Sequence, residues 1–166
     1  MLSHAKLPLL AAILVAAAGS HICTAQPLPS DPDVTVTKLP NGLNCLFKHH
    51  EQPAGQLVIL LNVRAGSLCE TDEQSGLAHF VECMSLHGSE HFPPGTLGEF
   101  LTSIGMKAGT NVNSRTDYDH SAYIIVTPTE KPEDVEKSLT ALADIASGLQ
   151  FPADQMDTVR NEILAE

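Results

Sequence analysis

Basic residues are scarce in this chain of 166 residues. Lysine and arginine together number 9, against 20 aspartates and glutamates, which gives a formal net charge of −11. A surface with this balance repels phosphate backbones and anionic lipid headgroups. We therefore expect no nucleic-acid partner, while the acidity by itself identifies no substrate.

Internal repeats are absent, and low-complexity sequence is limited to a short proline-rich stretch. Hydrophobic residues make up 43% and charged residues 17% of the chain. These values describe a globular protein and argue against disorder. The length allows one domain with a real core and is short for two.

Long apolar runs are confined to the N-terminus. Lys6 precedes an apolar run over residues 7–18, and Cys23-Thr24-Ala25 places small residues at −3 and −1 of a cleavage site before Gln26. The run is too short for a comfortable membrane span. It predicts a signal peptide over 1–25, export to the periplasm or the exterior, and no stable membrane anchor. An uncleaved anchor is the alternative interpretation.

Cysteine is also infrequent. Removal of a signal peptide would leave Cys45, Cys69 and Cys83. An odd number leaves at least one of them unpaired within the chain in an oxidising compartment. Cys69 and Cys83 are the pair to test first for a disulfide. Sequence alone does not show whether their Cβ atoms meet.

Periodicity and turn residues predict the secondary structure. Residues 26–33 read as an extended leader, and Asn41-Gly42 predicts a hairpin between strands at 34–39 and 43–47. The further strands are expected at 57–63, buried on both faces, near 107–114 and at 120–127, and the helices at 75–84, 96–104, 132–149 and 153–166. Residues 34–166 are thus expected to form an α+β domain, with helices against a largely antiparallel sheet.

Two of these helices carry more detailed expectations. Thr96 and Glu99 have the spacing of a capping box at the start of the second helix. The inward side of the helix at 132–149 is expected to consist of the residues Val135, Leu139, Leu142, Ala146 and Leu149.

The stretch 75–84 has the strongest chemical pattern. Its apolar stripe is Leu77, Phe80, Val81 and Met84. His79, Glu82 and Cys83 fall together on the opposite face. This spacing is that of the inverted zinc motif H-x-x-E-H, with Cys83 at the second histidine.

A hydrolytic zinc site needs three protein ligands, an open position for water and a base. His79 supplies one imidazole, and Glu82 is placed to accept a proton. Glu166 is the candidate for a ligand from elsewhere, because it falls close to the inward stripe of the last helix. One Zn²⁺ per site is the expected cofactor.

Several ordered segments resemble the pitrilysin/insulinase family of zinc metallopeptidases, in particular its bacterial, processing-peptidase-like branch. The resemblance rests on the segments Asn41-Gly42-Leu43, Ala65-Gly66-Ser67, 76–84, 88–93, 104–107, Asn113-Ser114-Arg115-Thr116 and 160–166. It covers roughly residues 34–166. It implies the N-terminal, metal-site-bearing part of a domain that hydrolyses peptide bonds.

By this resemblance, His79 and Glu166 are zinc ligands, Cys83 takes the position of another ligand, and Glu82 is the general base. The family's substrates add a strand to a sheet edge, and Asn113 is the matching position here. The implied partners are a peptide or protein substrate and a second homologous half or subunit.

Two departures from the family support a second hypothesis. A thiol at Cys83 reaches less far from the helix than an imidazole, which predicts weak or absent zinc binding. Val159 stands where the family commonly has a glutamate, and carboxylates around a metal orient its ligands. The alternative function is therefore a catalytically inactive family member that serves as a structural or peptide-binding partner.

Overall fold

The computed structural model describes residues 29–107 and 112–165, and it divides into two compact units at His49/His50. The described part of the first unit is a hairpin of β1 (Val34–Lys38) and β2 (Asn44–Lys48). Residues 29–33 of the predicted leader (26–33) precede β1, while residues 26–28 and the predicted signal peptide lie outside the described residues.

The hairpin forms where Asn41-Gly42 predicts it, with a longer connection than two residues. The strands pair antiparallel from Val34↔Lys48 to Lys38↔Asn44. The Leu39 N–H donates to the Leu43 carbonyl over 2.8 Å, and Gly42 takes the left-handed φ of 92°. A left-handed glycine closing a three-residue connection is a common hairpin solution.

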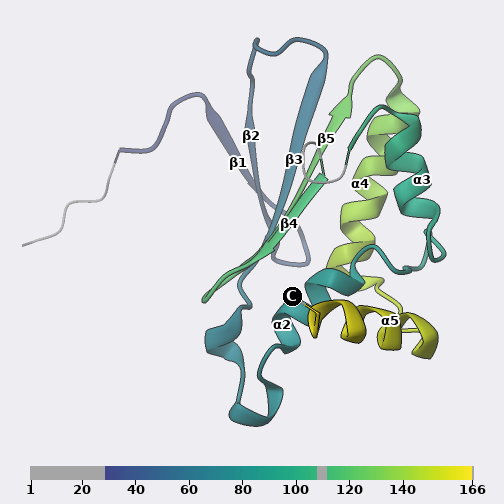
Figure 1. The fold of residues 1–166 in the computed structure, drawn as a ribbon. Coiled ribbons are helices and arrows are strands. Elements are labelled where there is room, and N and C mark those ends of the chain that lie inside the picture. The colour runs from purple at the N-terminus through teal and green to yellow at the C-terminus, as the bar shows by residue number, and fades with distance from the viewer. Residues whose placement is uncertain (1–28, 108–111, 166) are drawn as a thin grey trace, which may run out of the picture. The chain divides into compact units, whose positions relative to one another are not determined.

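The second unit is an antiparallel sheet covered by helices (Figure 1). The strands are β3 (Gln56–Val63), β4 (Val112–Thr116) and β5 (Ser121–Pro128), in the order β3-β5-β4. Two short 3-10 turns, η1 (Ser67–Cys69) and η2 (Asp72–Gln74), follow β3. The helices are α2 (Leu77–Met84), α3 (Thr96–Ser103), α4 (Pro132–Ser147) and α5 (Ala153–Ile163). The predicted α+β class is confirmed.

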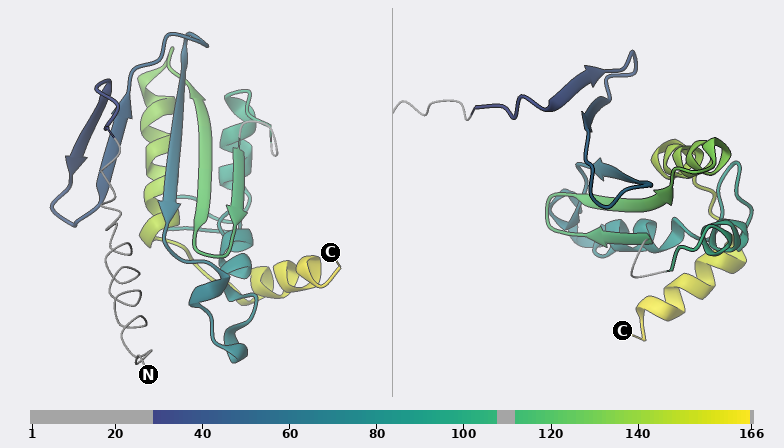
Figure 2. Two further views of the ribbon diagram at one scale, coloured as in Figure 1. Left: turned by 90° about the vertical axis from the view of Figure 1, so that its left-hand side faces the viewer. Right: turned by 90° about the horizontal axis from the view of Figure 1, so that it is seen from above.

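The core lies between the sheet and the helices on one of its faces (Figure 2). Helix α4 packs on β3 and β5, and α2 contacts both α5 and β4. The buried apolar cluster comprises Phe92, Leu97, Phe100, Leu101, Met106, Tyr123, Ile125, Ala141 and Leu142. No helix in the described part of the chain has the length and apolar character needed to cross a membrane.

The expectation that strand 57–63 is buried on both faces is wrong. Ile59, Leu61 and Val63 pack against the core, while Val58 and Leu60 are 62% and 59% exposed. The reason is that β3 is an edge strand of a sheet that carries its helices on one face. Alternate side chains of such a strand point away from the core.

Two local expectations for the helices also fail. Gly95 is the N-cap of helix α3 and supplies no side-chain cap, and the Thr96 hydroxyl donates to the Pro93 carbonyl instead of forming a capping box. In α4, Leu139 is 49% exposed, while Ser138 and Ala141 are fully buried. Small side chains at these two positions let the helix approach the sheet closely, and the Ser138 hydroxyl is satisfied by the Asp134 carbonyl at 2.8 Å.

Candidate active site

Helix α2 is fixed at both ends by contacts from outside the helix. Its N-cap, Gly76, has a left-handed φ of 86° and supplies no side-chain cap. The Glu70 carboxylate accepts hydrogen bonds from the Gly76 N–H at 2.8 Å and the Ala78 N–H at 2.7 Å. Met84 near the other end is fully buried. A negative group at a helix N-terminus satisfies free N–H groups and complements the helix dipole.

The apolar stripe of α2 is only partly buried. Leu77 is exposed, Phe80 and Val81 are half-buried, and Met84 is buried. Glu82 is 8% exposed, although it lies on the face opposite this stripe. The chemical face of α2 is therefore turned toward β4, which it contacts, rather than toward solvent.

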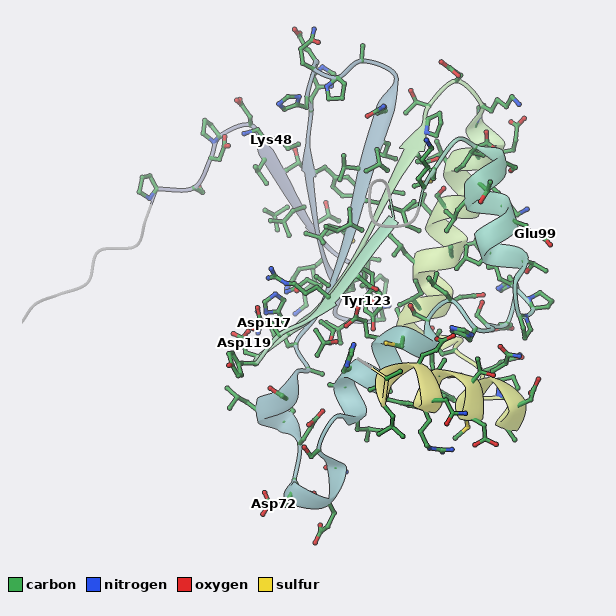
Figure 3. The ribbon with its side chains drawn as sticks, in the orientation of Figure 1. Lys48, Asp72, Glu99, Asp117, Asp119 and Tyr123 are labelled. Carbon is green, nitrogen blue, oxygen red and sulfur yellow. The ribbon has the colours of Figure 1, made fainter. Side chains whose placement is uncertain are left out.

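A close backbone approach joins η1 to the turn after β4. A Cβ at Gly66 would lie 2.2 Å from the Asp117 carbonyl oxygen, so only glycine fits there. The Ser67 N–H donates to that oxygen at 3.2 Å, and the Leu68 N–H donates to the Tyr118 carbonyl at 2.8 Å. Figure 3 shows Asp117 and Asp119 where β4 ends and the chain turns toward β5.

An open cleft of about 590 Å³ lies between these elements. It is lined by the residues Ser67, His79, Glu82, Ser114, Arg115, Thr116, Asp117 and Tyr118. Its volume falls in the range of about 300–1,000 Å³ that is typical of ligand sites. The cleft thus brings two residues of α2 beside an edge strand of the sheet.

Tyr123 connects the site to the core. Burial raises the pKa of its phenol, and electrostatic interactions with Glu82 and then with Cys83 raise this pKa further. These influences keep Tyr123 a neutral phenol over the physiological range. It also belongs to the apolar cluster beneath the sheet.

The predicted site residues occupy different environments. His79 and Glu82 line the cleft, whereas half-buried Cys83, one helical turn after His79, is not among the lining residues. Asn113 lies in β4, paired with Ile124 of β5, and its side chain is outside the described part. Glu166 is also outside the described residues. Cys69, which with Cys83 was the pair to test first for a disulfide, is a free thiol in this structure.

The described residues supply only part of the proposed zinc site at α2, because its third ligand, Glu166, lies outside them. Three zinc ligands must converge on one point. In residues 29–107 and 112–165, the side chains whose donor atoms converge within 4.8 Å are Glu90, His91 and Asp144, a group that includes none of His79, Glu82 and Cys83. His87 contacts Gln155 of α5 at 3.2 Å instead of the cleft.

The Glu90–His91–Asp144 group is an anchor for the loop after α2. The buried Asp144 carboxylate accepts hydrogen bonds from the Ser89 hydroxyl at 2.6 Å and the His91 N–H at 2.8 Å, and it contacts His91 Nδ1 at 2.8 Å. Burial raises the pKa of Asp144, but the hydrogen bonds from Ser89 and His91 outweigh it and leave the pKa below its usual value. The hydrogen bond to Asp144 in turn raises the pKa of His91.

Sequence reasoning missed Glu70, Tyr118 and Asp144 as residues of the site, and it did not predict the contacts of Thr116. Thr116 sits between α2 and β5, its hydroxyl 3.5 Å from the Ala78 carbonyl and 3.2 Å from the Ser121 hydroxyl. The contact with Ala78 joins residues far apart in the chain and leaves no local periodic signal. Gly66 and Thr116 both belong to family-like segments, which do not by themselves predict the contacts that these residues make.

Comparison with known proteins places the chain in a family. Residues 47–166 match the family described as Insulinase (Peptidase family M16). The chain therefore belongs to the M16 family, which is the insulinase/pitrilysin family that the motifs predict.

The relatives are longer proteins. The chain is 30% identical over 142 residues to the probable zinc protease PqqL of Escherichia coli, covering 86% of this chain and 15% of PqqL. The crystal structure of the first half of this periplasmic protease has a TM-score of 0.80 at 30% identity, over 83% of this chain and 30% of that one. A structure of the ferredoxin protease FusC with Arabidopsis ferredoxin has a TM-score of 0.70 at 29% identity, over 80% of this chain and 14% of that one.

Proposed function

We propose that this chain is the N-terminal, metal-site-bearing part of an exported zinc-dependent endopeptidase. The observation that carries the proposal is the cleft in which His79 and Glu82 lie beside the edge strand β4. Membership of the M16 family and the description of PqqL as a probable zinc protease support it. The periplasmic location given for PqqL supports export, with residues 1–25 as the signal peptide.

Peptide binding would use the main chain of β4. One side of β4 pairs with β5, and its other side pairs with no strand in the described residues. An open strand edge presents N–H and C=O groups that an extended peptide can pair with at little cost in side-chain specificity. Asn113 is the side chain proposed to contact the peptide there. The FusC complex with ferredoxin supports a protein or peptide as the substrate class.

Glu82 is the proposed general base. Its carboxylate is buried in the wall of the cleft and is placed to take a proton from a water molecule that attacks a peptide carbonyl. The same group can then deliver a proton to the departing amine. His79, Cys83 and Glu166 are the proposed zinc ligands, and a zinc ion held there would polarise the peptide carbonyl and lower the pKa of a bound water molecule.

Cys83 favours a second candidate function, an inactive family member that binds peptides without cleaving them. Cys83 does not line the cleft, whereas His79 and Glu82 do. Peptide affinity at β4 would survive the loss of zinc because it depends on main-chain pairing. In either case the relatives' greater length supports a second homologous half or subunit as a partner.

A metal titration on the full chain separates the two candidates. Zinc content by mass spectrometry and cleavage of a fluorogenic peptide library are measured for wild type, Cys83→His and Glu82→Gln. Cys45→His is the matched control, because Cys45 lies in β2 of the other unit. The endopeptidase proposal predicts one zinc per chain and cleavage that Glu82→Gln abolishes while zinc is retained.

The outcomes that contradict this proposal are also specific. A wild type without zinc, together with a Cys83→His variant that binds one zinc, would establish the inactive alternative. If no variant binds zinc or cleaves peptide, the described chain lacks the hydrolytic function.

A further inference from the structure

Arg115 lines the cleft, and the other residues that line it include no arginine and no lysine. It lies in β4, with a side chain that is 67% exposed. Its neighbours in the strand, Ser114 and Thr116, pair with Tyr123 and Ser121 of β5, which are both buried. Because side chains alternate along a strand, Arg115 stands on the opposite face from these two neighbours.

The ion pair that Arg115 makes is weak enough to exchange. Its Nη2 atom is 3.4 Å from Asp117 Oδ2, and the Asp117 side chain is 40% exposed. Exposed pairs of this kind contribute little to stability. Asp117 is also held independently, since its Oδ1 atom accepts a hydrogen bond from the Tyr118 N–H at 2.9 Å. The guanidinium can therefore leave Asp117 without exposing an unsatisfied group.

The strand register shows where a new partner would lie. Within the sheet, Arg115 stands opposite Ala122 of β5, which in turn stands opposite Asn62 of β3. Neither residue carries a charge that competes for the guanidinium. A peptide strand added at the other side of β4 places one of its own side chains directly opposite Arg115, and oppositely charged residues in that relation attract.

We propose that Arg115 forms a side-chain subsite for an aspartate or glutamate in a peptide strand added to the edge of β4. This inference rests on the proposed peptide binding and specifies which peptides are preferred. The arginine fork can hold a carboxylate through two parallel hydrogen bonds, which an amide side chain does not match. Glu82, the acidic residue that α2 contributes to the cleft, would repel an acid elsewhere in the peptide, so the preference is confined to one position.

The test measures binding instead of cleavage. Fluorescein-labelled ten-residue peptides carry Glu, Gln or Lys at each position in turn, and their affinity for the full chain is measured by fluorescence anisotropy. At one position we expect Glu to bind about two- to fivefold more tightly than Gln, and Lys to bind more weakly than both. Arg115→Gln is expected to abolish this order of affinities (Glu above Gln above Lys), and Arg115→Glu is expected to reverse it.

Arg160→Glu is the matched control, because Arg160 is an exposed arginine that pairs with Asp157 on α5, outside the cleft. This variant changes the net charge by the same amount as Arg115→Glu and should keep the wild-type order of peptide affinities. Hydrogen exchange of β4 is followed with the same peptides. Protection of β4 with equal affinity for Glu, Gln and Lys, or an unchanged order in Arg115→Glu, would overturn the subsite alone. Absence of β4 protection with every peptide would overturn the proposed function itself.

Discussion

Replacing Glu70 by alanine should loosen helix α2 and weaken the site that it carries. The Glu70 carboxylate accepts two hydrogen bonds, at 2.8 and 2.7 Å, from the first N–H groups of the helix. Loss of such a cap costs roughly 0.5–2 kcal/mol. Loss of a negative charge beside the helix N-terminus costs about 0.3–1 kcal/mol more. We therefore expect Glu70→Ala to lower the free energy of unfolding by about 1–3 kcal/mol.

The assay is urea unfolding of the full chain, followed by circular dichroism, together with the peptide affinity of the same variants. Glu70→Gln keeps an acceptor oxygen and should lose about half as much stability as the alanine variant. Glu73→Ala is the matched control, since Glu73 is an exposed acid in the same loop whose contact is a 3.4 Å hydrogen bond from Thr71. Equal destabilisation by Glu70→Ala and Glu73→Ala would refute the capping role.

Two further substitutions test other supports of the site. Gly66→Ala places a methyl group against the Asp117 backbone, so we expect the free energy of unfolding in urea to fall by about 1–3 kcal/mol and peptide binding to weaken. A variant with wild-type peptide affinity would contradict the close approach. Asp144→Asn should cost about 1–3 kcal/mol at neutral pH, because the buried carboxylate accepts charge-assisted hydrogen bonds. The pKa of Asp144 lies below its usual value of 3.8, so its contribution to the free energy of unfolding is complete above pH 3.8 and is lost on further acidification. The pKa of His91 is raised above its usual value of 6.5, so the contribution of His91 to the same free energy is complete below pH 6.5 and is lost at higher pH. A pH series of wild type and Asp144→Asn should show both changes only in wild type, and parallel curves would contradict the anchor.

The order and type of the elements could be predicted because the relevant signals are local. Asn41-Gly42 sits in the hairpin connection, and the inward stripe of the last helix corresponds to buried Val159 in α5. The failures concern which side of an element is buried. Leu139 of α4 continues an apolar periodicity yet is exposed, because the sheet packs instead against the small residues Ser138 and Ala141. Periodicity measures hydrophobicity, whereas close packing also depends on side-chain size.

The site could be predicted only for the residues that belong to one local sequence motif. His79 and Glu82 lie three residues apart on α2, so the helix alone places them on one face. The walls of the cleft come from η1 and from the turn after β4, which meet through backbone contacts at Gly66. The Cys69–Cys83 pairing depended on distances that the sequence does not encode, and Cys69 is a free thiol in the structure.

Hydrogen–deuterium exchange with a bound peptide tests the central claim most directly. If an extended peptide pairs with the edge of β4, those amides of Ser114–Thr116 that point away from β5 should become protected in its presence. The edge strand β3 of the same sheet is the internal control and should exchange unchanged. Protection confined to β4, together with slower exchange around His79 in α2, is the predicted result. Protection at β3 alone, or no protection of either edge, would contradict peptide binding in this cleft.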